Sequence, residues 1–410
     1  MNKQPASSTA PLMSERRVAL LGAALVAIGP ISMALFTPAM PEIVHAFGTT
    51  EAAVKMTLSL YFAGFAFAQL ICGPLSDGFG RKPVTIAFLA IYVVGSIFAL
   101  YAPTIEALIA ARFAQGVGAA VGVAIARAVV RDLFTHERSA RIMNLMGIML
   151  ASAPAFAPTL GGITMELAGW HAIFLLMVVI GFVLIVTVHL ALVETVRRDL
   201  SRVRPGALLK SYGLLLSTPY FVLCGVVMGA SIGTLYTQAT VLPFLLMNRV
   251  GLTATQFGLS MLIQTAGYLL GAVMVRIMIR RMGALRLVPI GLTCVGAGSA
   301  LLFTLLRLYE PSLLSVMGPV ALSTFGIAFV APALNTAALA PFPKNAGAAA
   351  SLSGFLQMGG GLAGGTICAM LRDPAFAMAT VIPAMGIISI IAWALWRRLP
   401  EPALRLHLPE

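Results

Sequence analysis

Apolar runs of about 20 residues recur along the whole chain, and no other feature limits its fold as strongly. A bilayer core about 30 Å thick is crossed by about 20 helical residues, because each adds 1.5 Å. Charged residues or clusters of proline, glycine and polar residues separate the runs, which predicts twelve membrane-spanning helices. Their predicted limits are residues 18–40, 56–75, 84–102, 105–126, 142–163, 172–193, 219–246, 255–279, 287–306, 313–334, 346–370 and 377–396.

The composition excludes a water-soluble globule. Hydrophobic residues make up 59% of the chain and charged residues only 10%, whereas soluble domains carry about 25% charged residues. The first run is too long for a cleaved signal peptide, so we expect a retained span. Each of the four cysteines lies alone in a different apolar run, which is typical of small hydrophobic residues and not of disulfides or metal ligands. They are Cys72, Cys224, Cys294 and Cys368.

The distribution of lysine and arginine predicts the orientation in the membrane. With the N-terminus inside, 22 of the 27 basic residues fall in cytoplasmic segments, four of them between the fourth and fifth spans. Cytoplasmic loops carry such an excess, so both termini are expected in the cytoplasm. The basic residues form no single arm or patch, which argues against nucleic-acid binding. The excess of arginine over lysine is typical of a GC-rich bacterial gene, and we expect a multi-pass protein of a bacterial inner membrane.

The longest polar stretch divides the predicted spans into six and six. We expect residues 1–194 to form an N-terminal six-helix bundle, residues 195–218 a cytoplasmic linker, and residues 219–410 a C-terminal six-helix bundle. The predicted fold is therefore an all-α integral membrane protein of two pseudo-symmetric bundles, with a cavity between them near the midplane.

Three motifs resemble those of the major facilitator superfamily. The sequence GPLSDGFGRK after the second span is similar to the family's loop signature, RFAQGVG to its fourth-span signature, and ASAPAFAPTLGG to the fifth-span motif of its drug antiporters. TPAMPEI, RAVVRDLF, GWHAIF and AGAAASLSGFLQM narrow the resemblance to the Bcr/CflA type, the bicyclomycin and chloramphenicol resistance transporters. The matching residues are Gly73, Asp77, Gly80, Arg81, Arg112, Gln115, Gly116, Gly118, Pro154, Pro158, Gly161 and Gly162.

The resemblance implies drug efflux by alternating access, with the drug exchanged for protons and no cofactor. Its partners would be a small-molecule drug, protons and the lipid bilayer, and we expect a monomer. In the resembled antiporters, proline and paired glycines in the fifth span prevent leak through the cavity. Gly78 stands where the loop signature usually has arginine, and Ala157 where the fifth-span motif commonly has glycine.

Arg112 lies inside the fourth span, where an unpaired charge is expensive unless it faces water or polar partners. We therefore predict that it faces the cavity and handles substrate or protons; the alternative is a structural arginine bonded to backbone carbonyls. At the cytoplasmic surface, Asp77 and Arg81 are four residues apart, and Arg131 and Asp132 end the fourth span. Paired across helices, they could hold one conformation and release it in the other, unless they are only solvated surface pairs.

The resembled antiporters commonly carry an acid in the first span, where this chain has Ala34. The usual exchange of drug for proton therefore lacks its carboxylate. Beside Arg112, the candidates for proton coupling are Glu42, near the outer end of the first span, and His189, in the sixth, since histidine titrates near pH 6.5. His45 is a weaker candidate, and transport without coupling is the remaining possibility.

A cavity with an arginine and no acid should repel cations and accept neutral or weakly acidic amphiphiles, such as amphenicols. Aromatic, methionine and amide side chains in otherwise aliphatic helices are adaptable contacts for such ligands. We expect them on the cavity faces of the first, second, fourth, fifth, seventh, eighth, tenth and eleventh spans. The predicted cavity residues, beside Arg112, are Phe36, Tyr61, Met146, Tyr236, Gln238, Gln264, Asn335, Phe355 and Gln357.

Other function classes find less support. The five histidines are dispersed and no hydrolase or metalloprotease motif is present, so we expect no enzyme. No soluble signalling domain accompanies the spans, which argues against a receptor. The alternative that remains is a metabolite or sugar transporter or facilitator of the same fold, not coupled through a membrane carboxylate.

Overall fold

The computed structural model describes residues 12–196, 198–199, 205–400 and 402, and these residues form helices and no β-strand. The helices before the polar stretch are α1 (Glu15–Phe36), α2 (Met40–Ala46), α3 (Glu51–Phe79), α4 (Arg81–Leu100), α5 (Ile105–Ala119), α6 (Val121–Leu133) and α7 (His136–Ala191). The later helices are α8 (Pro205–Leu216), α9 (Pro219–Pro243), α10 (Ala254–Met282), α11 (Ala284–Leu308), α12 (Leu313–Leu339), α13 (Ala346–Met370) and α14 (Pro374–Trp396). Short helical turns lie at η1 (Thr37–Ala39), η3 (Phe244–Arg249) and η4 (Pro343–Asn345).

Ten helical segments of the described chain are long and apolar enough to cross a membrane. They include Ala155–Ala191 as one segment, and the glycine-rich α13 is not among them. The fold is thus an all-helical membrane fold, whereas the number of twelve spans stays a prediction.

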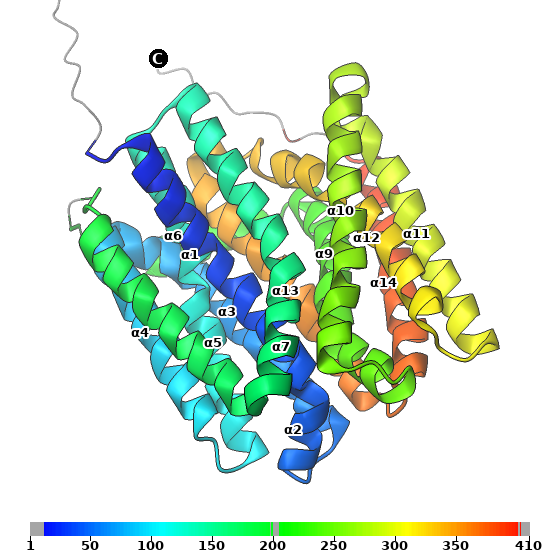
Figure 1. Cartoon of the computed structure of the whole chain (residues 1–410). Coiled ribbons are helices and arrows are strands. Elements are labelled where there is room, and N and C mark those ends of the chain that lie inside the picture. Colours follow the sequence, from blue (N-terminus) through cyan, green and yellow to red (C-terminus); the bar gives the residue numbers. More distant parts are fainter. Residues whose placement is uncertain (1–11, 197, 200–204, 401, 403–410) are drawn as a thin grey trace, which may run out of the picture.

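The predicted fifth and sixth spans form the single helix α7, which bends sharply at Gly169. A straight helix of its 56 residues would be about 84 Å long, far more than a bilayer core. Gly169 has φ 75°, in the left-handed region that side chains with a Cβ rarely adopt. Figure 1 shows the chain turning back at this point, so that the two arms of α7 run in opposite directions.

The predicted fourth span ends too early. We placed its end at residue 126, but after α5 the chain continues as α6 as far as Leu133. Arginine is a good helix former, so the charges at Arg127 and Arg131 do not end the helix. Both residues are helical and do not belong to the following loop.

Two pairs of long helices join the earlier part of the chain to the later part: α3 packs against α13, and α7 against α10. In Figure 1, α7 and α10 converge toward the lower end of the bundle and diverge toward the upper end, where α1 begins and α14 ends. The buried apolar side chains form one cluster within residues 13–192, joined by Phe244, and two further clusters within residues 215–396.

The lower ends of α7 and α10 are in close contact. A Cβ on Gly162 would lie 2.3 Å from the carbonyl oxygen of Ala254, so only glycine allows this approach. Four residues further along α7, the Glu166 carboxylate accepts hydrogen bonds from the backbone N–H and the hydroxyl of Thr255, at 2.9 and 2.7 Å. Gly161, beside Gly162, lies equally close to the backbone of Leu35 in α1. The two glycines therefore bring α7 against both α1 and α10.

At the upper end, α8 is tied to α3. Pro74 has no N–H, so the carbonyl of Leu70, four residues earlier in α3, lacks its helical donor. The Tyr212 hydroxyl of α8 donates to this carbonyl at 2.6 Å. Burial raises the pKa of Tyr212 to about 12, so the phenol keeps its proton at neutral pH.

Gly162→Ala is expected to open the lower end of the bundle. The added methyl group overlaps the Ala254 carbonyl, and such overpacking costs about 1–3 kcal/mol, which shifts a two-state population about tenfold. Spin labels at the exposed positions Leu167 and Leu259 should report longer distances. Gly213→Ala on α8, where a Cβ meets nothing within 4 Å, is the control. An unchanged distance distribution in Gly162→Ala would contradict the proposed closure.

Candidate functional site

A central cavity of about 470 Å³ lies between the earlier and later helices, within the size range of pockets for drug-sized molecules. Its walls come from α1, α3, α6 and α7 on one side and α9, α10, α12 and α13 on the other. These are the helices on which the sequence predicted cavity faces.

The cavity extends to the upper end of the bundle. Asp77, Arg81 and Arg131 line it at this end, together with Gly347 and Ser351 at the start of α13. The opposite end is closed by the contact between α7 and α10. The upper end carries the basic loops that the positive-inside rule assigns to the cytoplasm, so this conformation opens toward the predicted cytoplasmic side.

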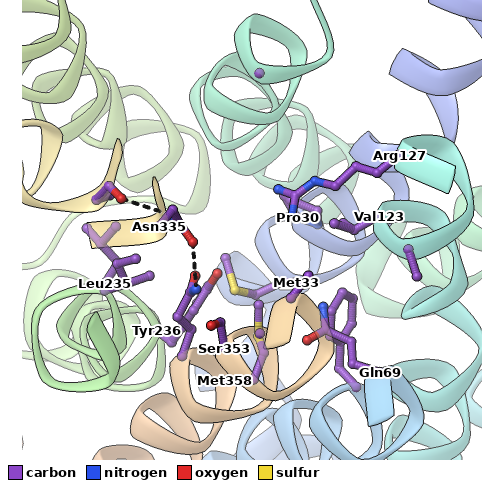
Figure 2. Close-up of a pocket in the computed structure, with 18 of the residues that line it drawn as sticks. Pro30, Met33, Gln69, Val123, Arg127, Leu235, Tyr236, Asn335, Ser353 and Met358 are labelled. Carbon is purple, nitrogen blue, oxygen red and sulfur yellow. Dashed lines mark hydrogen bonds between the residues drawn. The ribbon is translucent and has the colours of Figure 1, made fainter. Parts of the chain in front are cut away.

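Four of the predicted residues line the cavity: Tyr236, Gln264, Asn335 and Gln357. Figure 2 shows Tyr236 and Asn335 among the lining side chains. The Gln357 amide donates to the Asn335 side-chain oxygen at 3.4 Å, and Asn335 in turn donates to the Ala331 carbonyl at 2.9 Å. Gln264 donates to the Gln238 oxygen at 3.0 Å. The cavity thus presents amide groups in a largely apolar wall.

The other predicted cavity residues lie behind this wall. Gln238 is fully buried and supports Gln264 from within, while the Phe355 ring packs on Phe67 with centroids 5.5 Å apart. Met146 is buried against Gly22, where α7 meets α1. The expectation that these side chains face the cavity is therefore wrong, because each fills a helix contact. The residues absent from the lining are Phe36, Tyr61, Arg112, Met146, Gln238 and Phe355.

The prediction that Arg112 faces the cavity is also wrong. Its side chain is 0% exposed, with the Phe36 and Tyr61 ring centroids 4.4 and 4.5 Å from the guanidinium carbon. One guanidinium nitrogen donates to the Gln115 side-chain oxygen at 2.7 Å, and Gln115 donates to Ser96 at 2.7 Å. The aromatic faces attract the cation, so two rings and an amide hold the charge away from bulk solvent.

None of the three proton-coupling candidates lines the cavity. Glu42 is exposed on α2, and His189 is exposed near the end of α7. Helix α1 ends at Phe36, so Glu42 belongs to a separate short helix and not to the cavity face of α1. Ala34, at the position of the missing acid, does line the cavity. The only acid among the described lining residues is Asp77.

Arg81 is the centre of the predicted cytoplasmic latch. Its guanidinium pairs with Asp77 at 2.5 Å and with Asp132 at 3.1 Å, and it donates to the Ser76 hydroxyl at 2.6 Å. These partners come from α3 and α6, and Arg81 begins α4, so the cluster links three helices of the same part of the chain. Arg131 instead lines the cavity and makes no ion pair with the residues that the structure describes.

Glu194 joins this cluster and was not predicted. Its carboxylate accepts the backbone N–H groups of Arg81 and Lys82, at 2.8 and 3.1 Å. These are unpaired donors at the start of α4, where a negative charge is favourable. Gly80 has φ 106°, and a Cβ there would lie 2.7 Å from the Glu194 carboxylate. The sequence signal was an acid directly after the sixth span.

The remaining motif residues occupy different places. Gly73 and Pro158 line the cavity, from α3 and α7 respectively. Gly161 and Gly162 bring α7 close to α1 and α10. Pro154 falls in a stretch of α7 whose side chains lie outside the described part of the structure.

The cavity residue that sequence reasoning missed is Arg127. We counted it in the loop after the fourth span, but it lies on α6 and lines the cavity. Figure 2 shows its side chain extending from α6 toward Pro30. No group of three or more His, Cys, Asp or Glu residues that could hold a metal ion occurs in the described residues.

Arg112→Lys is expected to lower the thermal stability of the detergent-solubilised protein. Lysine keeps the charge but cannot lie flat between two rings, and losing such buried contacts costs about 1–3 kcal/mol. Arg307→Lys is a matched control, because Arg307 also lies over two rings but is exposed. A variant with unchanged stability and weakened substrate binding would contradict the structural role of Arg112.

Comparisons with known proteins agree with this architecture. The family profile described as Major Facilitator Superfamily matches residues 22–365. The "Multidrug resistance protein MdtL" of Shewanella sp. (strain ANA-3) is 27% identical over 391 residues, which cover 94% of this chain and 97% of that protein. The "Multidrug resistance protein D" of Escherichia coli (strain K12) is 26% identical over 379 residues, covering 90% and 93%.

Solved structures share the fold at low sequence identity. The crystal structure of a D-xylose-proton symporter has a TM-score of 0.75 and 13% identity, covering 95% of this chain and 99% of that one. That of an auto-inhibited POT family peptide transporter has a TM-score of 0.72 and 15% identity, covering 94% and 97%. Since the family profile extends over most of the chain, this protein belongs to the major facilitator superfamily and is a membrane transporter, not an enzyme.

Proposed function

We propose that this protein exports neutral or weakly acidic amphiphilic drugs, such as amphenicols, by alternating access. The observation that carries the proposal is the central cavity, whose apolar wall is interrupted by amide groups and which reaches the predicted cytoplasmic end. A drug dissolved in the cytoplasm or the inner leaflet can enter such a cavity directly from the cytoplasmic side, where the drug harms the cell. The multidrug-resistance names of the relatives favour the same function.

The finer parts of the proposal rest on the resemblance to Bcr/CflA-type antiporters. We propose twelve spans in a bacterial inner membrane, with bundles at residues 1–194 and 219–410 joined by the linker 195–218, acting as a monomer. Separate buried clusters before and after the linker support this division. Exchange of the drug for protons is the energy source that the resemblance implies.

A metabolite transporter or facilitator without proton coupling is the second candidate. It is favoured by the charges around the cavity, because Asp77 is the one acid among the described lining residues and it is paired with Arg81. Proton exchange and uncoupled transport differ in their response to a pH gradient.

Purified protein in proteoliposomes is expected to transport chloramphenicol faster than ethidium. The cavity walls carry more positive than negative side chains, and a cation is repelled by them. Ala34→Asp adds a carboxylate to the wall and should shift the preference toward ethidium by about tenfold, the effect of one added charge contact. An imposed pH gradient separates the two candidates. Rapid ethidium transport by the unmodified protein would contradict the proposed selectivity.

Asp77→Asn is expected to slow transport by about tenfold without loss of membrane insertion. The substitution removes the carboxylate charge that pairs with the buried Arg81, and a charged hydrogen bond of this kind contributes about 1.5–3 kcal/mol. Glu15→Gln is the control, since Glu15 pairs with the exposed Arg141 at 3.4 Å, an interaction worth about 0–1 kcal/mol. Drug export at the unmodified rate in Asp77→Asn would show that the cluster is no latch.

A further inference from the structure

Arg127 is an arginine of the cavity wall whose charge is unmatched. It lines the cavity from α6, and its guanidinium makes no hydrogen bond or ion pair with the residues that the structure describes. Arg81, by contrast, pairs with two carboxylates. A guanidinium carries five N–H donors in a planar fork that matches a carboxylate, sulfonate or phosphate.

Arg131 strengthens this positive region. It lies four residues after Arg127 on the same helix and also lines the cavity, so the two side chains are neighbours on one helical face. The lining therefore holds three arginines and one acid, and that acid is already bound to Arg81. Charges near low-dielectric walls act more strongly than in water, so the region attracts an anion.

The cavity surface around the charge includes apolar and adaptable side chains. Met33 of α1 and Met358 of α13 line the cavity beside Tyr236, and Figure 2 shows the three side chains in the same view as Arg127. Methionine adjusts to ligands of different shape. Gln69 of α3 adds a buried side-chain oxygen that has no partner in the described structure. An occupant that satisfies both the arginines and this apolar surface has one anionic group and an apolar body.

The energy source follows from the same charges. Alternating access moves a bound anion across the membrane with its charge, unless a proton moves with it. Ala34, Glu42 and His189 provide no proton-binding group in the cavity, and arginine stays charged. In a cell with a negative interior, the membrane potential alone drives an anion outward.

We propose that Arg127 is the anion-binding residue of the cavity, and that the chain exports monoanionic amphiphiles electrogenically, driven by the membrane potential without a protein-bound proton. This rests on the proposed function as an exporter, specifies its substrate class and replaces proton exchange by the membrane potential as the energy source. Arg127 binds the anionic group, and the methionine and tyrosine side chains contact the apolar body.

The test uses the purified full chain in proteoliposomes with 8-anilino-1-naphthalenesulfonate, whose sulfonate stays ionised over the whole pH range. Potassium gradients with valinomycin impose a potential at equal pH, and protein-free vesicles give the background. An interior-positive potential is expected to accelerate uptake, up to about a tenfold concentration ratio for each 59 mV. Uptake that follows a pH gradient and ignores the potential would overturn the proposal.

Variants of Arg127 assign the site. Arg127→Gln should slow transport of the sulfonate about tenfold or more, because a hydrogen bond between two charged groups is lost, whereas Arg127→Lys should restore most of it. Arg307→Gln, an exposed arginine of α11 outside the cavity, is the control and should leave transport unchanged. Size-exclusion profiles verify folding. If Arg127→Gln does not fold, the anion site is tested by the transport rate of Arg127→Lys and by the dependence of uptake on the membrane potential.

Chloramphenicol in parallel vesicles separates the two proposals. Transport of chloramphenicol but not of the sulfonate, or equal sulfonate transport by Arg127→Gln and the unmodified protein, overturns the anion site and leaves the exporter standing. Transport of neither compound overturns the proposed function itself. Transport of the sulfonate that depends on the membrane potential and on Arg127 supports the anion site, whether or not chloramphenicol is transported.

Discussion

A charge inside a membrane protein must find a partner or water, because hydrocarbon offers neither, and this constraint explains the site. The structure meets it in four ways. Arg112 lies between two aromatic rings, and Arg81 binds two carboxylates. Lys55, 1% exposed, pairs with Glu51 at 3.4 Å and lies 5.1 Å from the centre of the Phe244 ring. Arg127 faces the cavity without an ion-pair partner among the described residues, whereas Arg81 lines the cavity with its carboxylates in place.

The sequence predicted the depth of a charged residue in the membrane better than the direction of its side chain. The hydropathy pattern located Arg112 inside a span, and that part was correct. Its direction depends on Phe36 and Tyr61, which belong to two other helices, so it follows from packing and not from the helix that carries it. Arg127 was missed for a local reason: a charge after an apolar run looks like the end of a span, although arginine extends a helix readily.

The fold shows the same difference between what a helix's own sequence predicts and what depends on its packing against other helices. The apolar runs and the motifs predicted an all-helical membrane protein of this superfamily, and the family profile confirms it. Cavity-facing helices were anticipated correctly as a set, yet only Tyr236, Gln264, Asn335 and Gln357 of the named residues line the cavity. A helix has several faces, and a rotation of about 100° per residue separates a lining residue from its neighbour. Composition cannot fix that rotation.

Opening the closed end requires contacts between the two parts of the chain to separate, and these contacts are of a kind that separates easily. Glu166 is exposed and Thr255 is half-buried, and water can replace their hydrogen bonds. Asn248 and Glu51, at 3.3 Å, form a similar exposed pair. Lys55 and Phe244 are both buried, and they lie on α3 and η3, so this contact must break as well. The Arg81 cluster lies within α3, α4 and α6 and crosses no such boundary. It therefore links helices of one part of the chain, whereas the contacts at the closed end join the two parts that must separate.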